Sequence, residues 1–337
     1  MITKIAFLST AGIAALGLSL STQAGAASVS AQSLSGGQSY AGGALEIENF
    51  IGVIEIREGG DEITVAVENT GGLVEDPMVS ATSSSVRVDG GQTLRRINCN
   101  TRNNQMRIGT RFDMHDIEEY PRLVITAPAD TTLSLHDSAY RATAGDLGAL
   151  DLGVASCGDF ESGDIAGDAD IFIGGSGDVI TGTVGGNAEI SINGSGDIET
   201  GRVAGYGEIS INGSGDVETD DFGGDVEVSI NGSGDVRTGD VSSLQVSING
   251  SGDVAADALN GAFQARIGGS GDITIDRGRA EPFSVDVHGS GDVSFGGTAV
   301  DVRVNESGSG DVEIADMEGS IDWRRHGRSV VRSGGYD

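Results

Sequence analysis

A four-residue motif, Gly-Ser-Gly-Asp, recurs at a nearly constant spacing through the second half of this 337-residue chain. A degraded copy, Ser156-Cys157-Gly158-Asp159, precedes the intact ones, and from Asp159 to Asp311 the mean step is 19 residues. The eight intact copies carry their aspartates at Asp178, Asp197, Asp216, Asp235, Asp253, Asp272, Asp292 and Asp311. Self-similarity at a fixed period predicts a repeat architecture, in which each unit stacks on its neighbours.

The residues around the motif alternate between apolar and polar, which is the period of a β-strand. Apolar side chains are therefore expected to point inward, and Ser, Thr, Glu and Asp outward. A 19-residue unit cannot bury such a stripe alone, but stacking coils about 4.8 Å apart would bury it continuously. The residues expected inside are Ile190, Ile192, Ile198, Ile209, Ile211, Val217, Val228 and Ile230.

This pattern predicts an all-β fold, a right-handed parallel β-helix (solenoid) with coils of about 19 residues, the handedness following from the general chirality of parallel crossovers. The 56 glycines are expected at the corners, where the backbone needs a positive φ. Residues 45–125 are expected to be the N-terminal strands and cap, residues 126–320 the repeat solenoid, and residues 321–337 a C-terminal cap or tail.

The start of the chain is typical of a secretory signal peptide. A short positive start ending at Lys4 precedes an apolar run from Ile5 to Leu20 and the small-residue cleavage pattern Ala24-Gly25-Ala26. Residues 1–26 are thus expected to be removed, and residues 27–44 to form a flexible leader. Since no later stretch reaches membrane-spanning length, we expect no transmembrane segment after cleavage. The protein is expected to be exported, either to the periplasm or to the cell surface and extracellular space.

The charge balance narrows the range of partners. The chain carries 51 acidic against 20 basic residues, a formal net charge of −31, and Lys4 is its only lysine. Such a charge opposes binding to nucleic acid and to anionic lipid. It favours attraction of divalent cations.

Two cysteines, Cys99 and Cys157, are the only ones in the chain. In an oxidising compartment they could form a disulfide, although the sequence does not show whether their Cα atoms approach closely enough. The alternative is a pair of buried, inert thiols.

The row of eight aspartates is the strongest candidate for chemistry. In a stacked solenoid their carboxylates would recur about every 4.8 Å and repel one another unless exposed, hydrogen-bonded or neutralised. The favoured interpretation is that each aspartate accepts backbone N–H groups within its turn and faces water. The alternative is calcium bridging successive coils, which would make all eight aspartates metal ligands. Calcium β-rolls use a nine-residue repeat that is absent here, so no cofactor is expected.

Two further groups of residues are candidates for stability or recognition. Asn193, Asn212, Asn231 and Asn249 precede four of the corners and are expected to form an amide ladder along the solenoid. The arginines Arg87, Arg95, Arg96, Arg102, Arg107 and Arg111 concentrate positive charge in one segment. They either pack against acidic coils or form a recognition patch for an anionic glycan or partner.

No enzymatic motif stands in the required context. His115, His136, His288 and His326 lie far apart in sequence without metal-ligand spacing. The repeated serines are corner residues rather than a unique nucleophile, and no phosphate-binding or dinucleotide fingerprint is found. We therefore predict that the protein is not an enzyme and has no catalytic residues.

The run of Gly-Ser-Gly-Asp-Val/Ile corners, with the Ile54-Glu55-Ile56 and Ile63-Thr64-Val65 strands, resembles the head GIN domain family of auto-transporter adhesins over roughly residues 45–315. That resemblance implies an exported bacterial β-helix and an adhesive role, and it transfers no catalytic residues. The favoured function is a non-catalytic, adhesin-like or structural module of the cell envelope, with a surface glycan or protein as partner. The alternative is a polysaccharide-binding or polysaccharide-cleaving protein on the same scaffold.

Overall fold

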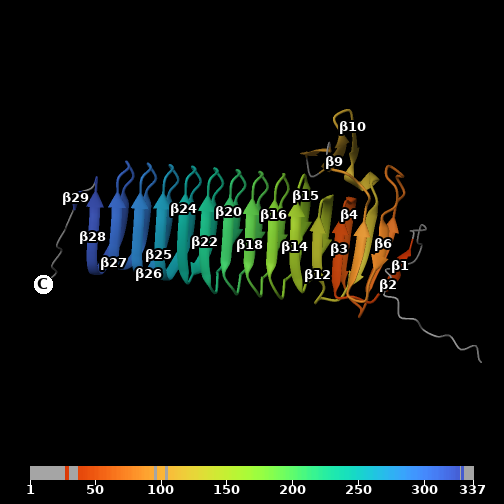
Figure 1. Ribbon diagram of the computed structural model, residues 1–337, viewed down its shortest axis with the longest axis horizontal. Coiled ribbons are helices and arrows are strands. Elements are labelled where there is room, and N and C mark those ends of the chain that lie inside the picture. Colours follow the sequence, from red (N-terminus) through yellow and green to blue (C-terminus); the bar gives the residue numbers. More distant parts are fainter. Residues whose placement is uncertain (1–26, 30–36, 95–96, 103–104, 327, 330–337) are drawn as a thin grey trace, which may run out of the picture.

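The chain forms an elongated β-solenoid in the computed structural model, which describes residues 27–29, 37–94, 97–102, 105–326 and 328–329. The coils follow one another along a single axis, with the N-terminal strands at one end and β28 at the other (Figure 1). The predicted signal peptide, residues 1–26, lies outside the described residues. Within the described part, no helix is long and apolar enough to cross a membrane.

Most coils contain two strands that pair in parallel with the matching strands of the next coil. The first series is β12 (Thr132–His136), β14 (Ala149–Val154), β16 (Ala169–Ile173), β18 (Ala188–Ile192), β20 (Gly207–Ile211), β22 (Asp225–Ile230) and β24 (Ser243–Ile248). The second series is β13 (Ala139–Ala144), β15 (Gly158–Glu161), β17 (Val179–Thr181), β19 (Ile198–Thr200), β21 (Val217–Thr219) and β23 (Val236–Val241).

Towards the C-terminus each coil becomes one long bent strand. These strands are β25 (Val254–Ile267), β26 (Ile273–Val287), β27 (Val293–Glu306) and β28 (Val312–Arg325), and β29 (Arg328–Ser329) folds back antiparallel on β28. Trp323, expected in a separate cap or tail, therefore lies in the last coil.

The N-terminal end adds antiparallel strands to the parallel stack. β3 (Ala44–Glu48) and β4 (Ile51–Glu58) pair in parallel with β12 and β13 and so begin the solenoid. The strands added around them are β1 (Ala27–Val29), β2 (Gln38–Tyr40), β5 (Ile63–Glu68), β6 (Met78–Ala81), β7 (Ser85–Asp89) and β11 (Arg122–Ala127). β1, β2 and β5 pair antiparallel with β6, β5 and β11 respectively. Part of the expected flexible leader thus contributes short strands.

The predicted core is confirmed. All eight residues expected inside are at most 1% exposed, and Ile192, Ile211 and Ile230 stand in register on successive coils. The period of about 19 residues is likewise confirmed by the register of the ladder. The right-handed winding stays a prediction.

One detail of the inside-outside assignment is wrong. Thr181, Thr200 and Thr219, expected outward, are at most 5% exposed and line the interior, as does Thr238. Strand alternation places Thr200 on the same face as Ile198, so the apolar neighbour two residues away decides its direction. The hydroxyl of Thr200 donates to the carbonyl of Gly201 at 3.2 Å, which satisfies it inside the coil.

The reason for the corner glycines also differs from expectation. Among the sixteen glycines of the intact motifs, only Gly177 has a positive φ in the left-handed region, at 148°. The constraint on the others is close stacking, because a Cβ built on Gly196 or Gly215 would overlap the carbonyl oxygen of the glycine one coil before it. Coil-to-coil contact through bare backbone therefore explains the motif better than turn conformation.

Candidate interaction surfaces

The aspartate row is organised by hydrogen bonds between coils. The carboxylate of Asp197 accepts the backbone N–H of Asp216 at 2.8 Å, and that of Asp216 accepts the N–H of Asp235 at the same distance. The same bond recurs from Asp178 to Asp311, at 2.7–3.3 Å. The seven aspartates from Asp178 to Asp292 thus satisfy a corner N–H of the following coil rather than one in their own turn, and the carboxylate of the last, Asp311, pairs with Arg325. This arrangement gives the carboxylates a structural purpose that needs no metal.

We expect calcium to leave the stability of the protein nearly unchanged. Across the described residues, no three His, Cys, Asp or Glu side chains come together to hold a metal ion. The measurement is thermal unfolding with chelator, with millimolar Ca²⁺ and with Mg²⁺ at equal ionic strength, since screening acts alike for both ions. A ligand at a hundredfold excess over its dissociation constant would add about 2.7 kcal/mol. A calcium-specific rise of about 10 °C, abolished in Asp197→Asn with Asp216→Asn, would contradict this expectation.

The aspartate of the degraded first corner, Asp159, is half-buried. Burial raises the pKa of Asp159, and the charge of Asp178 raises it further, against the lowering effect of the Asp178 N–H that it accepts. Because the folded pKa is raised, the contribution of Asp159 to stability is complete below the unfolded pKa. It is lost as the pH rises through the folded value.

Asp159→Asn is therefore expected to raise the melting temperature at pH 7 by about 1–3 °C, and to change it little at pH 3, where the wild-type carboxyl is already neutral. The amide oxygen can still accept the N–H of Asp178, so the corner bond is kept. Melting curves of both proteins at the two pH values make the comparison. An equal change in melting temperature at pH 7 and pH 3 would show that the effect does not arise from ionisation of Asp159.

The asparagine ladder takes the form expected from the sequence. The amide of Asn212 donates to the side-chain oxygen of Asn193 at 3.0 Å, and Asn231 and Asn249 extend the series at 3.0 and 3.1 Å. His288 stands on the same line of corners and lies 2.5 Å from the hydroxyl of Ser307. These contacts stabilise coil stacking.

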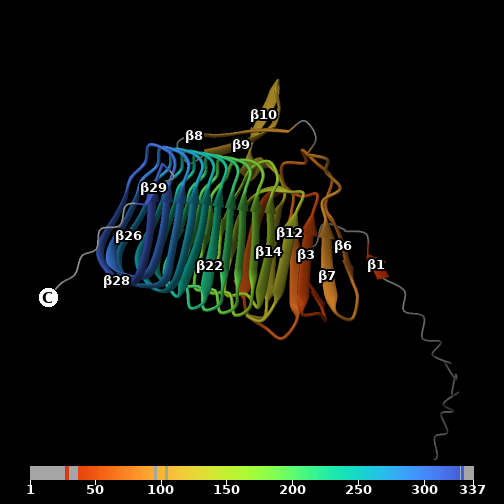
Figure 2. The ribbon, with the colours of Figure 1, turned by 60° about the vertical axis from the view of Figure 1, so that its left-hand side comes forward.

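A small antiparallel sheet, which ends in the turn between β9 (Gln105–Thr110) and β10 (Asp113–Asp116), projects from the N-terminal part of the solenoid (Figures 1 and 2). It consists of β8 (Asn98–Arg102), β9 and β10, is separate from the sheet of the solenoid, and is followed by the short 3₁₀ helix η1 (Ile117–Glu119). The segment is inserted between β7 and β11. We call it the projecting hairpin.

The base of the projecting hairpin is fixed to the solenoid. A disulfide joins Cys99 on β8 to Cys157 at the first corner, with Cα atoms 6.1 Å apart. Beside it, Met106, Ile108 and Ile117 are buried in a second apolar cluster together with solenoid residues such as Ala139. A covalent link and a small core at its base give the hairpin a defined position.

The tip of the projecting hairpin exposes an aromatic side chain. Phe112, in the turn between β9 and β10, is 93% exposed, and the guanidinium of Arg111 lies 5.9 Å from its ring centroid. An exposed phenylalanine at the end of an anchored hairpin gains nothing for folding. Its position suits contact with a partner.

Two of the clustered arginines, Arg87 and Arg107, pair with nearby acids or carbonyls. Arg87 pairs with Glu48 across β7 and β3, and Arg107 lies 3.3 Å from Asp116 and donates to the carbonyl of Met114. Residues 95–96 and the side chain of Arg102 lie outside what the structure describes. The described members of the group are therefore distributed between the solenoid and the hairpin.

A groove of about 560 Å³ runs along the face formed by β20, β22, β24 and β25. Tyr206, 53% exposed, stands at one end of it, and Ala262 and Gln264 stand at the other. The outward residues Glu208, Glu227 and Gln245 follow one another in register, and the amide of Gln245 donates to Glu227 at 2.8 Å.

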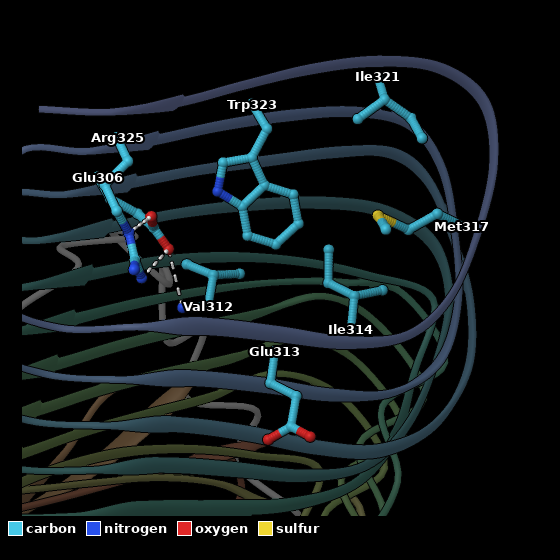
Figure 3. A pocket seen from close by; sticks show the side chains of 8 residues that line it. All are labelled: Glu306, Val312, Glu313, Ile314, Met317, Ile321, Trp323 and Arg325. Carbon is cyan, nitrogen blue, oxygen red and sulfur yellow. Dashed lines mark hydrogen bonds and ion pairs between the residues drawn. The ribbon is translucent and has the colours of Figure 1, made fainter. Parts of the chain in front are cut away.

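The C-terminal end of the solenoid is hollowed (Figure 3). A cavity of about 340 Å³ is lined by apolar side chains of the last coil, including Ile314 and Trp323. Glu306 is only 1% exposed, and it occupies a core position that is apolar in earlier coils. It accepts the N–H of Val312 at 3.1 Å and pairs with Arg325 at 2.6 Å, so an ion pair ends this line of the core.

The histidines do not converge. His115 lies on the projecting hairpin between Asp113 and Glu119, whereas His136 pairs with Asp151 at 2.7 Å on the solenoid. Two exposed aromatic side chains, Phe112 and Tyr206, were missed by sequence reasoning. Tyr206 could have been found by aligning the repeats, because Asn187 and Asp225 at the same position in the adjoining coils are small and polar.

The family comparison covers most of the solenoid and the projecting hairpin. A family model described as "Putative auto-transporter adhesin, head GIN domain" matches residues 71–258 and 256–321. No curated protein matches the chain.

Proposed function

Because the chain belongs to the family described as "Putative auto-transporter adhesin, head GIN domain", we propose that it is an exported, non-catalytic adhesion module of the bacterial cell envelope. The matched residues include the hairpin strands, the corners and nearly all of the coils. The family description supports adhesion over catalysis. It is also consistent with the export signal predicted in residues 1–26.

The observation that carries this proposal is the projecting hairpin with its exposed Phe112. A solenoid whose coils are joined by continuous backbone and side-chain ladders is a stiff support. The disulfide at Cys99 and Cys157 fixes the hairpin to that support, and disulfides persist in oxidising compartments outside the cytoplasm. A fixed element that displays an aromatic side chain can bind without a large ordering cost.

The location of the protein is tested by fractionation of cells combined with protease treatment of intact cells. An envelope adhesin is expected in the surface-exposed, protease-accessible fraction. Recovery only in the protected periplasmic fraction would contradict an adhesive role at the surface.

The role of the hairpin is tested by comparing the adherence of cells that produce the wild type, Phe112→Ser or Phe172→Ser. Phe172 is the matched control, because it is an exposed phenylalanine, 39% exposed, on the side of the solenoid. At equal surface levels, adherence should fall only with Phe112→Ser, by about tenfold if the side chain is a central contact. Equal adherence of all three would overturn the assignment of the hairpin.

A further inference from the structure

The groove beside Tyr206 differs from the rest of the solenoid surface. In the neighbouring coil, the Asn187 oxygen accepts the backbone N–H of Tyr206 at 3.1 Å, just as Asp168 accepts that of Asn187 at 2.8 Å. A tyrosine has no side-chain oxygen near its own backbone, so it cannot accept the N–H of the following coil in the same way. The series of side-chain hydrogen bonds therefore ends at Tyr206, whose ring is exposed.

Two further departures from the repeat accompany Tyr206. Gly207 occupies a position that holds Ala188 and Val226 in the adjoining coils. Phe222 stands where the two preceding coils have Val184 and Val203, and its ring lies where a side chain at position 207 would be. The extra volume of Phe222 therefore fills the space left by Gly207. Such a compensated break in a regular repeat is expected at a site kept for function rather than for stability.

The charge of the groove indicates the kind of ligand. Glu208, Asp225 and Glu227 line it, and its described lining contains no arginine, lysine or histidine. The register places Glu208 and Glu227 on adjacent strands, where two like charges repel. A cation between them would relieve that repulsion, whereas an anionic polymer would meet both these acids and the net charge of −31.

We propose that this groove binds a short linear oligosaccharide of amino sugars with free amines. The ring of Tyr206 provides a platform for the apolar face of a sugar and for its ammonium group. Glu208 and Glu227 accept hydrogen bonds from ammonium and hydroxyl groups, and the amides of Gln245 and Gln264 can both donate and accept. The groove spans four coils, about 14 Å at the spacing of β-strands, so several sugar units would be in contact. This surface is separate from the projecting hairpin, and the inference does not depend on adhesion.

The test is calorimetric titration of the purified full chain with a glucosamine hexamer at about pH 6, where exposed carboxylates are ionised. The wild type should bind it. Tyr206→Asn restores the residue type of the preceding coil, so it should keep or raise the melting temperature while weakening binding by about tenfold or more. Glu227→Gln should also weaken binding, whereas Glu199→Gln, an equal change of charge on another face, should not.

Hexamers of N-acetylglucosamine, galacturonate and lysine separate the contributions of the ammonium groups, the sugar rings and the positive charge. The N-acetylglucosamine hexamer should bind more weakly because it lacks the ammonium groups. The galacturonate hexamer should not bind because it is anionic. The proposal is overturned if the glucosamine hexamer does not bind, or if Tyr206→Asn binds it as well as the wild type does. It is also overturned if hexalysine binds equally to the wild type and to Tyr206→Asn. The same holds if the N-acetylglucosamine hexamer binds the wild type as tightly as the glucosamine hexamer does.

Discussion

Ile211→Asp is expected to disrupt the central coils, with a loss of about 5 kcal/mol or more in the free energy of unfolding. Ile211 is fully buried and lies in register between Ile192 and Ile230. A carboxylate there has no partner among the apolar side chains, and removal of the isoleucine also leaves a cavity. Both effects belong to the few mechanisms that cause losses of this size.

The loss should be local at first, because each coil of a solenoid contacts only its neighbours. Amide hydrogen exchange is expected to show lost protection in β18, β20 and β22, and chemical denaturation followed by circular dichroism gives the overall effect. Ser210→Asp is the matched control, since the adjacent Ser210 points outward and is only half-buried. Equal losses for the two variants would contradict the inside-outside assignment.

The sequence was sufficient to predict the coils because their signal is repeated. Any one strand such as Ile209-Ser210-Ile211 is ambiguous alone, but eight corners in register leave only a stacked arrangement. The row of buried threonines shows where the expectation that polar side chains point outward fails. Thr200 is polar in the sequence, yet strand alternation beside Ile198 and a nearby carbonyl acceptor place it inside.

The candidate surfaces were less accessible to sequence reasoning because they depend on single departures from the pattern. Phe112 follows Arg111 in a segment without repeats, and nothing in its neighbours indicates a hairpin tip. Cys99 and Cys157 are 58 residues apart, and only the folded hairpin shows that their Cα atoms lie 6.1 Å from each other. Interactions across such separations are set by the tertiary fold and not by local preference.

Gly215→Ala is expected to destabilise the solenoid by about 2–4 kcal/mol, although it adds a single methyl group. The new Cβ would overlap the carbonyl oxygen of Gly196, an atom of the backbone that cannot rotate away. Relief requires the two coils to separate, which would strain the bond from the Asp216 N–H to Asp197 and the apolar contacts beneath it. Thermal and urea unfolding of the variant measure the loss.

Two controls separate stacking from the general properties of glycine. Gly43→Ala adds the same methyl group where no atom lies within 4 Å, so it should be neutral or slightly stabilising through the unfolded state. Ser214→Ala, next to Gly215 but exposed, should cost less than about 1 kcal/mol. If Gly215→Ala were as mild as these two, the corner glycines would not be required by coil-to-coil contact. The recurrence of Gly-Ser-Gly-Asp would then have to be explained by the serine and aspartate alone.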